Sequence, residues 1–192
     1  MRIGVLALQG DFAKHGEALT RLGVDWREVR TPNDLTGLDG IIIPGGESTT
    51  MLRLMRDEGL FEPLRQFVNK HTTFGTCAGA ILLAREVHNP LQESLQAMDI
   101  TIERNAYGRQ IDSFTTSAQA SALGNEPVEL VFIRAPIIVK TGADVTVLAK
   151  YQDQPILVRQ GHMLAATFHP ELTTDTRIHK LFLNMVEEAM QQ

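Results

Sequence analysis

Residues 74–84 read Phe-Gly-Thr-Cys-Ala-Gly-Ala-Ile-Leu-Leu-Ala and hold the only cysteine of the chain, Cys77, between Gly75 and Gly79. The residues before the cysteine are typical of the end of a short buried strand, and residues 78–85 favour a helix with an apolar face. Cys77 is therefore predicted to lie on a sharp strand-to-helix turn, where small neighbours are needed because the turn leaves little room. The start of a helix would favour its thiolate, which indicates a nucleophile. The alternative is a small buried core residue, which is what most single cysteines are.

Size and composition predict one globular domain spanning residues 1–192. Hydrophobic residues make up 43% of the chain and charged residues 21%, which argues against long disordered segments. The formal net charge of −5 and the pI near 5.7 leave no basic excess, so we expect neither nucleic acid nor an anionic membrane as a partner.

A single cysteine excludes an internal disulfide and any site built from several cysteines, and we predict no metal site and no cofactor. No apolar run approaches the roughly 18 residues that a membrane helix needs. The N-terminal apolar run, residues 3–8, is ended by Gln9-Gly10-Asp11 and is too short for a signal peptide. These features predict a soluble cytoplasmic protein.

Apolar periodicity predicts alternating strands and helices in the first half of the chain. Expected strands are residues 2–8, 24–29, 40–43 and 73–75, and expected helices are 12–22, 48–58 (capped by Ser48 or Thr49), 61–70, 78–85 and 176–190. Shorter strands are expected at residues 100–103, 114–117, 128–133, 145–151, 155–159 and 163–168, and a polar loop at 31–38. The alternation predicts an α/β fold with a three-layer, doubly wound, mostly parallel sheet and an antiparallel extension, in which ligands gather at the carboxyl ends of the strands.

A cysteine nucleophile needs a base and a group that orients the base. His169 follows the apolar strand 163–168 and is followed by Pro170-Glu171, so it can emerge at a strand end with Glu171 to hold its imidazole. Taken alone, this stretch could also be a plain strand-ending turn. The other histidines are weaker candidates: His15 is expected to be solvated or to contact a partner, His179 to be structural or part of a surface, and His71, His88 and His162 to lie in polar stretches or turns.

The turn at Gly45-Gly46 follows the strand 40–43 and lacks the features of a phosphate loop or a dinucleotide fingerprint. Glycines let the backbone approach a ligand closely. The N–H groups of Gly46 and Ala78 could therefore form an oxyanion hole, although a plain turn is the alternative.

These stretches together resemble the triad-type glutamine amidotransferases, and in particular the family of glutaminase subunits of pyridoxal 5'-phosphate synthases. The resemblance spans nearly the whole chain. It is carried by Leu-Gln-Gly-Asp at 8–11, Pro-Gly-Gly-Glu-Ser-Thr-Thr at 44–50, Gly-Thr-Cys-Ala-Gly at 75–79, Arg-Asn-Ala-Tyr-Gly-Arg-Gln at 104–110, Phe-Ile-Arg-Ala-Pro at 132–136 and His-Pro-Glu-Leu at 169–172.

The resemblance implies a class I glutamine amidotransferase-like, flavodoxin-like fold with Cys77 as nucleophile and His169 and Glu171 completing the triad. It implies that the substrate is L-glutamine and that the released ammonia passes to a separate synthase (lyase) subunit in a hetero-oligomer. It also implies glutamine contacts from Gly46, Glu47, Ser48, Arg104, Ile133 and Arg134. Two other functions stay open at this point: a cysteine hydrolase or peptidase on the same fold, and a non-catalytic regulatory subunit.

Overall fold

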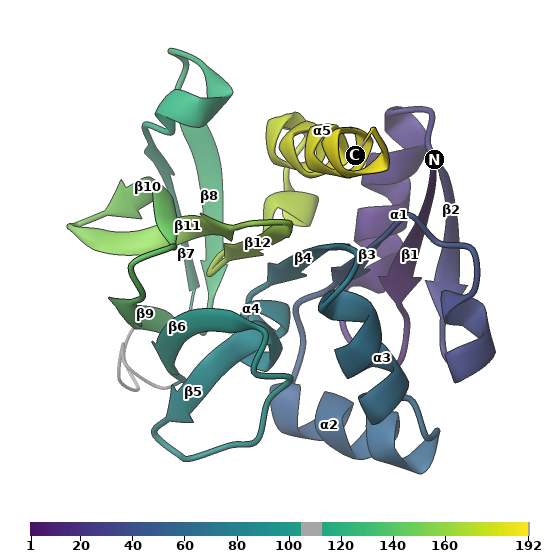
Figure 1. The fold of residues 1–192 in the computed structure, drawn as a ribbon. Helices are drawn as coiled ribbons and strands as arrows, with labels where there is room; N and C mark the ends of the chain where they lie inside the picture. Colours follow the sequence, from purple (N-terminus) through teal and green to yellow (C-terminus); the bar gives the residue numbers. More distant parts are fainter. Residues whose placement is uncertain (105–112, 192) are drawn as a thin grey trace.

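The computed structural model describes residues 1–104 and 113–191, and the arrangement of its elements is shown in Figure 1. A seven-stranded sheet forms its centre, in the order β10-β11-β12-β4-β3-β1-β2. The strands β12, β4, β3, β1 and β2 run parallel to one another, while β10 and β11 are antiparallel additions at one edge. The structure therefore confirms the predicted doubly wound, mostly parallel sheet with an antiparallel extension.

The parallel part alternates strands with helices along the first half of the chain. Its elements are β1 (Arg2–Leu6), α1 (Phe12–Arg21), β2 (Asp25–Val29), β3 (Gly40–Ile43), α2 (Ser48–Asp57), α3 (Phe61–Val68), β4 (Thr72–Thr76) and α4 (Ala78–Leu83), completed by β12 (Met163–Ala166) and α5 (Arg177–Met190). A short 3-10 helix, η1 (Pro32–Leu35), lies in the predicted polar loop, and another, η3 (Pro170–Leu172), follows β12.

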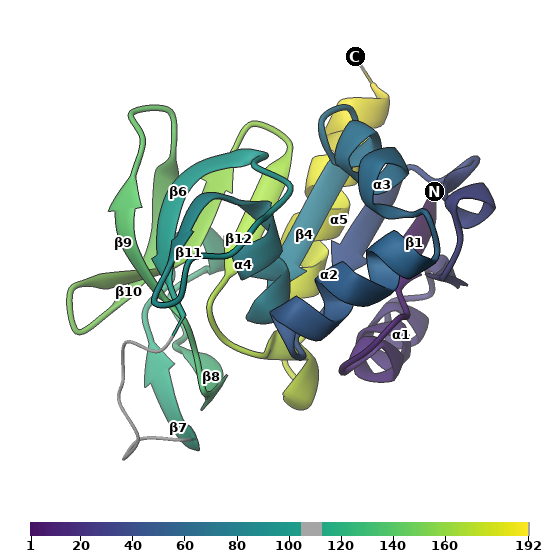
Figure 2. The same ribbon diagram turned by 90° about the horizontal axis from the view of Figure 1, so that it is seen from below.

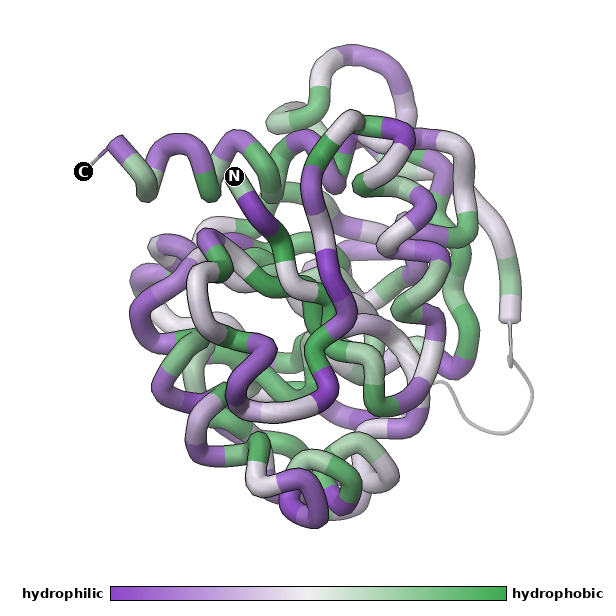
Figure 3. The backbone as a smooth tube through the Cα atoms, turned by 90° about the vertical axis from the view of Figure 1, so that its right-hand side faces the viewer, coloured by the Kyte–Doolittle hydropathy of each residue, from purple (hydrophilic) through white to green (hydrophobic). Residues whose placement is uncertain are grey.

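The central strands of the sheet are buried on both faces, and an apolar layer packs against each face. In β3, Ile41 and Ile43 pack with the buried side chains of α2, α3 and α4, while Ile42 packs on the other side with α1 and α5. Figures 1 and 2 show α5 on one side of the sheet and α2 and α3 on the other. In Figure 3, α5 alternates between hydrophilic and hydrophobic stretches along its length, as expected for a helix with one buried face.

The second half of the chain adds smaller antiparallel pieces. β10 (Thr146–Tyr151) and β11 (Gln154–Gln160) extend the main sheet, and β7 (Ser113–Ala118) pairs with β8 (Val128–Ile133), between which a 3-10 turn, η2, covers Ser121–Leu123. A three-stranded sheet consists of β5 (Ala84–His88), β6 (Met98–Glu103) and β9 (Ile137–Thr141). These pieces place the end of β8 beside the carboxyl ends of the parallel strands.

Two strands were not predicted, and one of them replaces the end of a predicted helix. The helix expected over 78–85 ends at Leu83, and the chain continues as β5, because parallel pairing with β6 overrides the helical preference of the alanine- and leucine-rich run. β9 was not predicted at all, and it exists through antiparallel pairing with β6. Both strands therefore form because they pair with β6, and local sequence preference alone does not predict them.

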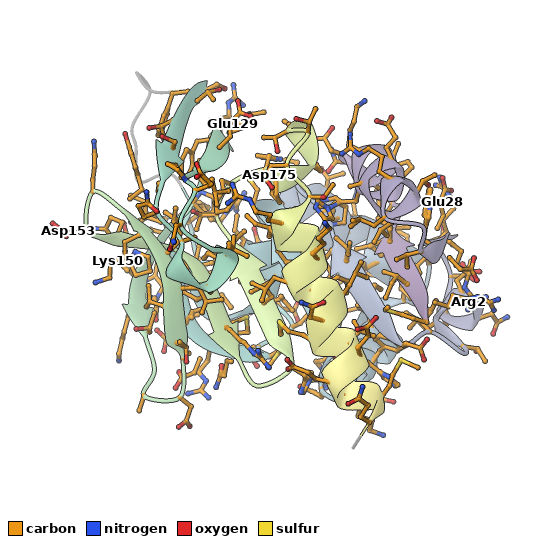
Figure 4. All side chains as sticks on the ribbon, turned by 90° about the horizontal axis from the view of Figure 1, so that it is seen from above. Arg2, Glu28, Glu129, Lys150, Asp153 and Asp175 are labelled. Carbon is orange, nitrogen blue, oxygen red and sulfur yellow. The ribbon has the colours of Figure 1, made fainter. Side chains whose placement is uncertain are left out.

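Charged side chains protect the two edges of the main sheet. Figure 4 labels Arg2 and Glu28 at the β2 side and Lys150 and Asp153 at the β10 side, and all four are exposed. Such charges discourage pairing with the edge of another molecule. Among the residues described, no helix is long and apolar enough to cross a membrane.

Candidate active site

Cys77 occupies the sharp turn predicted between β4 and α4. Its φ of 48° and ψ of −102° lie where residues other than glycine are rarely found, and such strain is typical of functional turns. The surroundings hold the turn in place: a Cβ on Gly79 would collide with the carbonyl oxygen of Ile43, and one on Gly75 would come within 2.7 Å of the Gly79 backbone. The elbow therefore forms only because the two glycines let three backbone segments pack closely.

The backbone around Cys77 is firmly bonded, while its thiol is held weakly. The Cys77 N–H donates to the carbonyl of Ala166 in β12 at 2.8 Å, which ties the elbow to the neighbouring strand. The sulfur lies 3.9 Å from the carbonyl oxygen of Ile133, a distance at the limit for a thiol donor. Cys77 is only 6% exposed. The backbone of the elbow is therefore fixed by the neighbouring strand, while the side chain of Cys77 lines the cavity described below.

His169 emerges just beyond the end of β12, as predicted. Its backbone N–H donates to Val131 in β8 at 2.8 Å, and its ring packs so close to Gly45 that a Cβ there would lie 2.8 Å from Nδ1. His169 Nδ1 is 2.7 Å from Glu171 Oε1, and both side chains are buried. The lack of a side chain at Gly45 thus leaves room for the His169 ring. His169 and Glu171 have the geometry of a base with its orienting carboxylate.

The electrostatics favour a protonated imidazole. Burial lowers the pKa of His169, but its interactions with Cys77 and Glu171 outweigh burial and raise the pKa to about 10. Burial raises the pKa of Glu171, and the bond to His169 opposes that shift. The Cys77 contribution consists of a hydrogen-bond interaction and a charge interaction, and His169 Nε2 is buried with no other hydrogen-bond partner among the described residues. This nitrogen is available for proton transfer.

A cavity of about 440 Å³ opens in front of Cys77 and His169. It is lined by all the residues that were predicted to contact glutamine and by three further residues that were not predicted as contacts. The first group is Gly46, Glu47, Ser48, Arg104, Ile133 and Arg134, and the second is Gln9, Asp11 and Ile81. Ala78, predicted for the oxyanion hole, is buried directly behind the elbow and does not line the cavity.

Glu47 and Arg104 form a charged pair at the cavity wall. Burial raises the pKa of Glu47, but hydrogen bonds from the hydroxyl and N–H groups of Thr49 and Thr50 outweigh it and lower the pKa to about 2. Arg104 Nη2 lies 3.3 Å from Glu47 Oε1. Glu47 is therefore an anion that fixes an arginine beside the cavity, and it also caps α2, so the prediction of Ser48 or Thr49 as the cap was wrong. A carboxylate replaces the expected hydroxyl because it can accept from both Thr49 N and Thr50 N.

The turn after β3 is held by the loop between β1 and α1. Gly46 has a φ of +154°, and its neighbour's N–H, that of Glu47, donates to Gln9 Oε1 at 2.7 Å. Ser48, the first residue of α2, donates its hydroxyl to Gln92 Oε1 at 2.8 Å. The structure also places Gln9 in the cavity wall.

Ile133 and Arg134 reach the cavity from the end of β8. Arg134 has a φ of 44°, another strained position at the site. Arg104 is the last described residue before the gap, and positions 105–110 of the family-like stretch lie outside the described residues. The cavity wall is thus assembled from several separate segments of the chain.

Asp11, His169 and Glu171 bring potential metal-ligand atoms within 4.8 Å of one another. Because His169 Nδ1 already donates to Glu171 Oε1, its lone pair is not available to an ion. The arrangement fits a triad better than a metal centre.

Sequence reasoning misjudged His15. It was expected to be solvated or to contact a partner, but it is fully buried, with Nε2 3.1 Å from Thr76 Oγ1 and 3.5 Å from Glu171 Oε2, and Nδ1 3.0 Å from His179 Nε2. The sequence did indicate this burial, because His15 lies four residues before Leu19 and so belongs to the apolar face of α1. His179, expected to be structural or on a surface, is fully buried on α5.

A parallel sheet of this order with a cysteine elbow facing a histidine–glutamate pair is the architecture of class I glutamine amidotransferases, and solved structures agree. One described as a glutamine amidotransferase superposes with a TM-score of 0.90 at 48% identity, covering 96% of this chain and 98% of the other. A putative GMP synthase protein from Thermoplasma acidophilum, 19% identical, gives a TM-score of 0.71 over 100% of this chain and 96% of its own, which shows the fold alone.

The comparisons of sequence identify the family. The model of the SNO glutamine amidotransferase family matches residues 5–188, and the chain belongs to this family. Two relatives carry the name pyridoxal 5'-phosphate synthase subunit PdxT. That of Koribacter versatilis is 57% identical over 98% of this chain and 97% of its own length, and that of Thermotoga petrophila is 51% identical over 97% and 100%.

Proposed function

We propose that this protein is the glutaminase subunit of a pyridoxal 5'-phosphate synthase, which hydrolyses L-glutamine to glutamate and ammonia. The family membership and the names of relatives at 51–57% identity support the proposal. The observation that carries the chemistry is the common cavity of Cys77 and His169, with Glu171 2.7 Å behind the histidine. The ammonia passes to a separate synthase subunit, and the complex acts in the cytoplasm, where a lone thiol stays reduced.

The first half of the reaction releases ammonia. The Cys77 thiolate attacks the side-chain amide carbon of glutamine, and the N–H groups of Gly46 and Ala78 stabilise the oxyanion, which requires the Ala78 N–H to turn toward the cavity when the synthase partner is bound. The His169 imidazolium then gives its Nε2 proton to the departing nitrogen, the C–N bond breaks, and a γ-glutamyl thioester remains. The pKa of about 10 keeps this proton on His169 until the leaving group needs it.

The second half hydrolyses the thioester. Neutral His169 takes a proton from a water molecule as that water attacks the thioester carbon, and the C–S bond breaks to give glutamate. The thiolate and the imidazolium are thereby restored. Throughout both halves, Glu171 holds the imidazole through Nδ1, so that Nε2 faces the sulfur and the substrate.

Glutamine is held by residues of the cavity lining. Gly46, Glu47, Ser48, Ile133 and the two arginines at positions 104 and 134 contact it. Arg104 has its side chain only 15% exposed and is fixed by Glu47, so it suits the α-carboxylate of the substrate.

Covalent labelling tests the proposal. A glutamine-like diazo-ketone should add once to the peptide that contains Cys77, and excess L-glutamine should slow the addition. Glutamate release should also increase when the purified synthase partner is added. Labelling at another residue would contradict the nucleophile assignment, and cleavage of peptides without any action on free glutamine would favour a peptidase instead.

A further inference from the structure

A cluster of buried polar side chains lies directly behind the triad. It consists of His15 on α1, Thr76 at the end of β4 and His179 on α5, and each is fully buried. Phe74 meets both imidazole rings edge-on, with centroids 6.2 and 6.1 Å away, so the cluster is embedded in apolar packing. Polar groups in such surroundings are costly unless they bond to one another. The bonds that the three side chains make therefore decide what the cluster can do.

His15 is the member that reaches the triad. Its Nε2 lies 3.1 Å from the hydroxyl oxygen of Thr76 and 3.5 Å from Oε2 of Glu171. Thr76 directly precedes Cys77, and Glu171 holds His169. One imidazole nitrogen therefore touches both the segment that carries the nucleophile and the carboxylate that orients the base.

Glu171 needs a partner on that side. Its Oε1 is bonded to His169, but Oε2 is buried and makes no hydrogen bond to any described residue. An N–H from His15, 3.5 Å away, would reduce the cost of burying this charge. The contact is long for a hydrogen bond at rest, and a small movement of either side chain would close it.

The bonding pattern indicates which nitrogen of His15 carries the proton. Burial, followed by the neighbouring charges of His179 and His169, lowers the pKa of His15 well below its usual value, so the ring is neutral. If Nε2 is protonated, it donates to Thr76 and Glu171, and Nδ1 accepts from His179 Nε2 at 3.0 Å. The opposite tautomer would turn a lone pair toward Glu171 and leave a buried N–H on His179 Nδ1, which has no hydrogen-bond partner among the described residues.

We propose that His15 is a positioning residue of the triad, whose Nε2–H holds the Glu171 carboxylate in the orientation that directs His169 at Cys77. His179 supports the ring through Nδ1, and Thr76 joins it to the elbow. His15 touches neither substrate nor the reacting atoms. This inference rests on the proposed glutaminase function.

Two amide substitutions separate positioning from simple packing. In His15→Gln the side-chain amide extends to about the place of Nε2, whereas in His15→Asn it reaches only that of Nδ1. We expect His15→Asn to lower kcat for glutamine about 10–100-fold, the range for removal of a residue that supports a catalytic group. KM should change less than about threefold, and His15→Gln should recover most of kcat. The assay contains the synthase partner, and thermal unfolding is measured for each variant.

Three further measurements test the inference, and the second of them needs no variant to fold. In a Glu171→Gln background, His15→Asn should cause little further loss of kcat, because the group it positions has already been changed. In the unmodified protein, the ¹⁵N chemical shifts of labelled histidines should show His15 as the neutral tautomer protonated on Nε2. The pH profile of kcat/KM should shift in His15→Asn relative to the unmodified protein and return in His15→Gln.

Three results would overturn the inference: equal loss of kcat in the Asn and Gln variants, full additivity with Glu171→Gln, or a His15 protonated on Nδ1. The titratable groups near His15 are Glu171, His169, His179 and Asp11. The pH profile of kcat/KM in the His15 variants is therefore compared with the profile in Glu171 variants. The proposed function fails in a different way, since glutamine turnover that survives Cys77→Ala would contradict it without involving His15.

Discussion

The two walls of the cavity are built in different ways. The inner wall consists of Cys77 and His169, with Glu171 directly behind the histidine. These three residues are 6%, 3% and 3% exposed and are fixed by glycine contacts, backbone bonds and buried imidazoles. The outer wall consists of residues 46–48 and Arg104, which lie at loops and element ends; the Glu47 side chain is 48% exposed. Packing fixes the inner wall, whereas polar bonds fix the outer wall.

This difference separates the two functions of the site. The inner wall needs geometry good to a fraction of an ångström, because proton transfer depends on it. The outer wall must admit glutamine and can be completed by other parts of a complex. Changes to the inner wall should therefore reduce kcat, and changes to the outer wall should raise KM.

Among the residues that orient the reacting groups or bind glutamine, the largest effect is expected for Glu171→Gln. The substitution preserves size but removes the charge, and an amide N–H facing His169 Nδ1 would favour the wrong tautomer. We expect kcat for glutamine to fall by about 10³–10⁴-fold with KM changed less than about threefold. Glu188→Gln, which alters an exposed ion pair with Arg159, is the matched control and should retain full activity. A loss of less than about tenfold in Glu171→Gln would break the distinction between the walls.

Acid should weaken the layer behind the inner wall before it affects the outer one. Burial, followed by the Arg21 charge, lowers the pKa of His179 from 6.5 to about 4. A lowered pKa means that the unfolded chain binds the proton first, so stability falls as the pH drops from 6.5 to 4. His179 alone should contribute a loss of about 3 kcal/mol in the free energy of unfolding. Glu47, with a pKa of about 2, keeps its charge over this range.

Urea unfolding of the unmodified protein and of His179→Gln at several pH values measures this effect. The variant should lose distinctly less stability between pH 6.5 and pH 4, the range set by the two pKa values of His179, even if it is less stable at neutral pH. The same pH slope in both proteins would contradict a neutral, buried His179.

The smallest effect is expected at the outer wall. Arg104→Gln should raise KM for glutamine about 10–100-fold, because a buried charge-assisted contact to a carboxylate contributes about 1.5–3 kcal/mol. Its kcat should stay within about threefold. Arg85→Gln breaks an exposed ion pair with Asp99 away from the cavity and should change neither constant. A fall in kcat at unchanged KM would contradict this expectation, because it would show that Arg104 acts in the chemical step as the inner wall does.

The inner wall was largely predictable from sequence. Local patterns placed Cys77 on a strand-to-helix turn and His169 at a strand end, and a parallel sheet brings such ends together. The strands β5 and β9 were missed because their pairing with β6 is a matter of tertiary contact, which local preference does not show.

Other features were missed for chemical reasons. The cap of α2 is Glu47, which satisfies two backbone N–H groups, where a hydroxyl was expected. His15 was expected to be solvated or to contact a partner, but the apolar face of α1 and the buried His179 on α5 enclose it. The oxyanion donors, the glutamine contacts and the handover of ammonia stay predictions.

Glutamate release by Cys77→Ala in the presence of the synthase partner tests the central claim most directly. We predict that the variant folds, binds glutamine and releases no glutamate above the uncatalysed background, and that Cys77→Ser and His169→Asn behave alike. Glutamine turnover by Cys77→Ala within about tenfold of the unmodified protein would contradict the account.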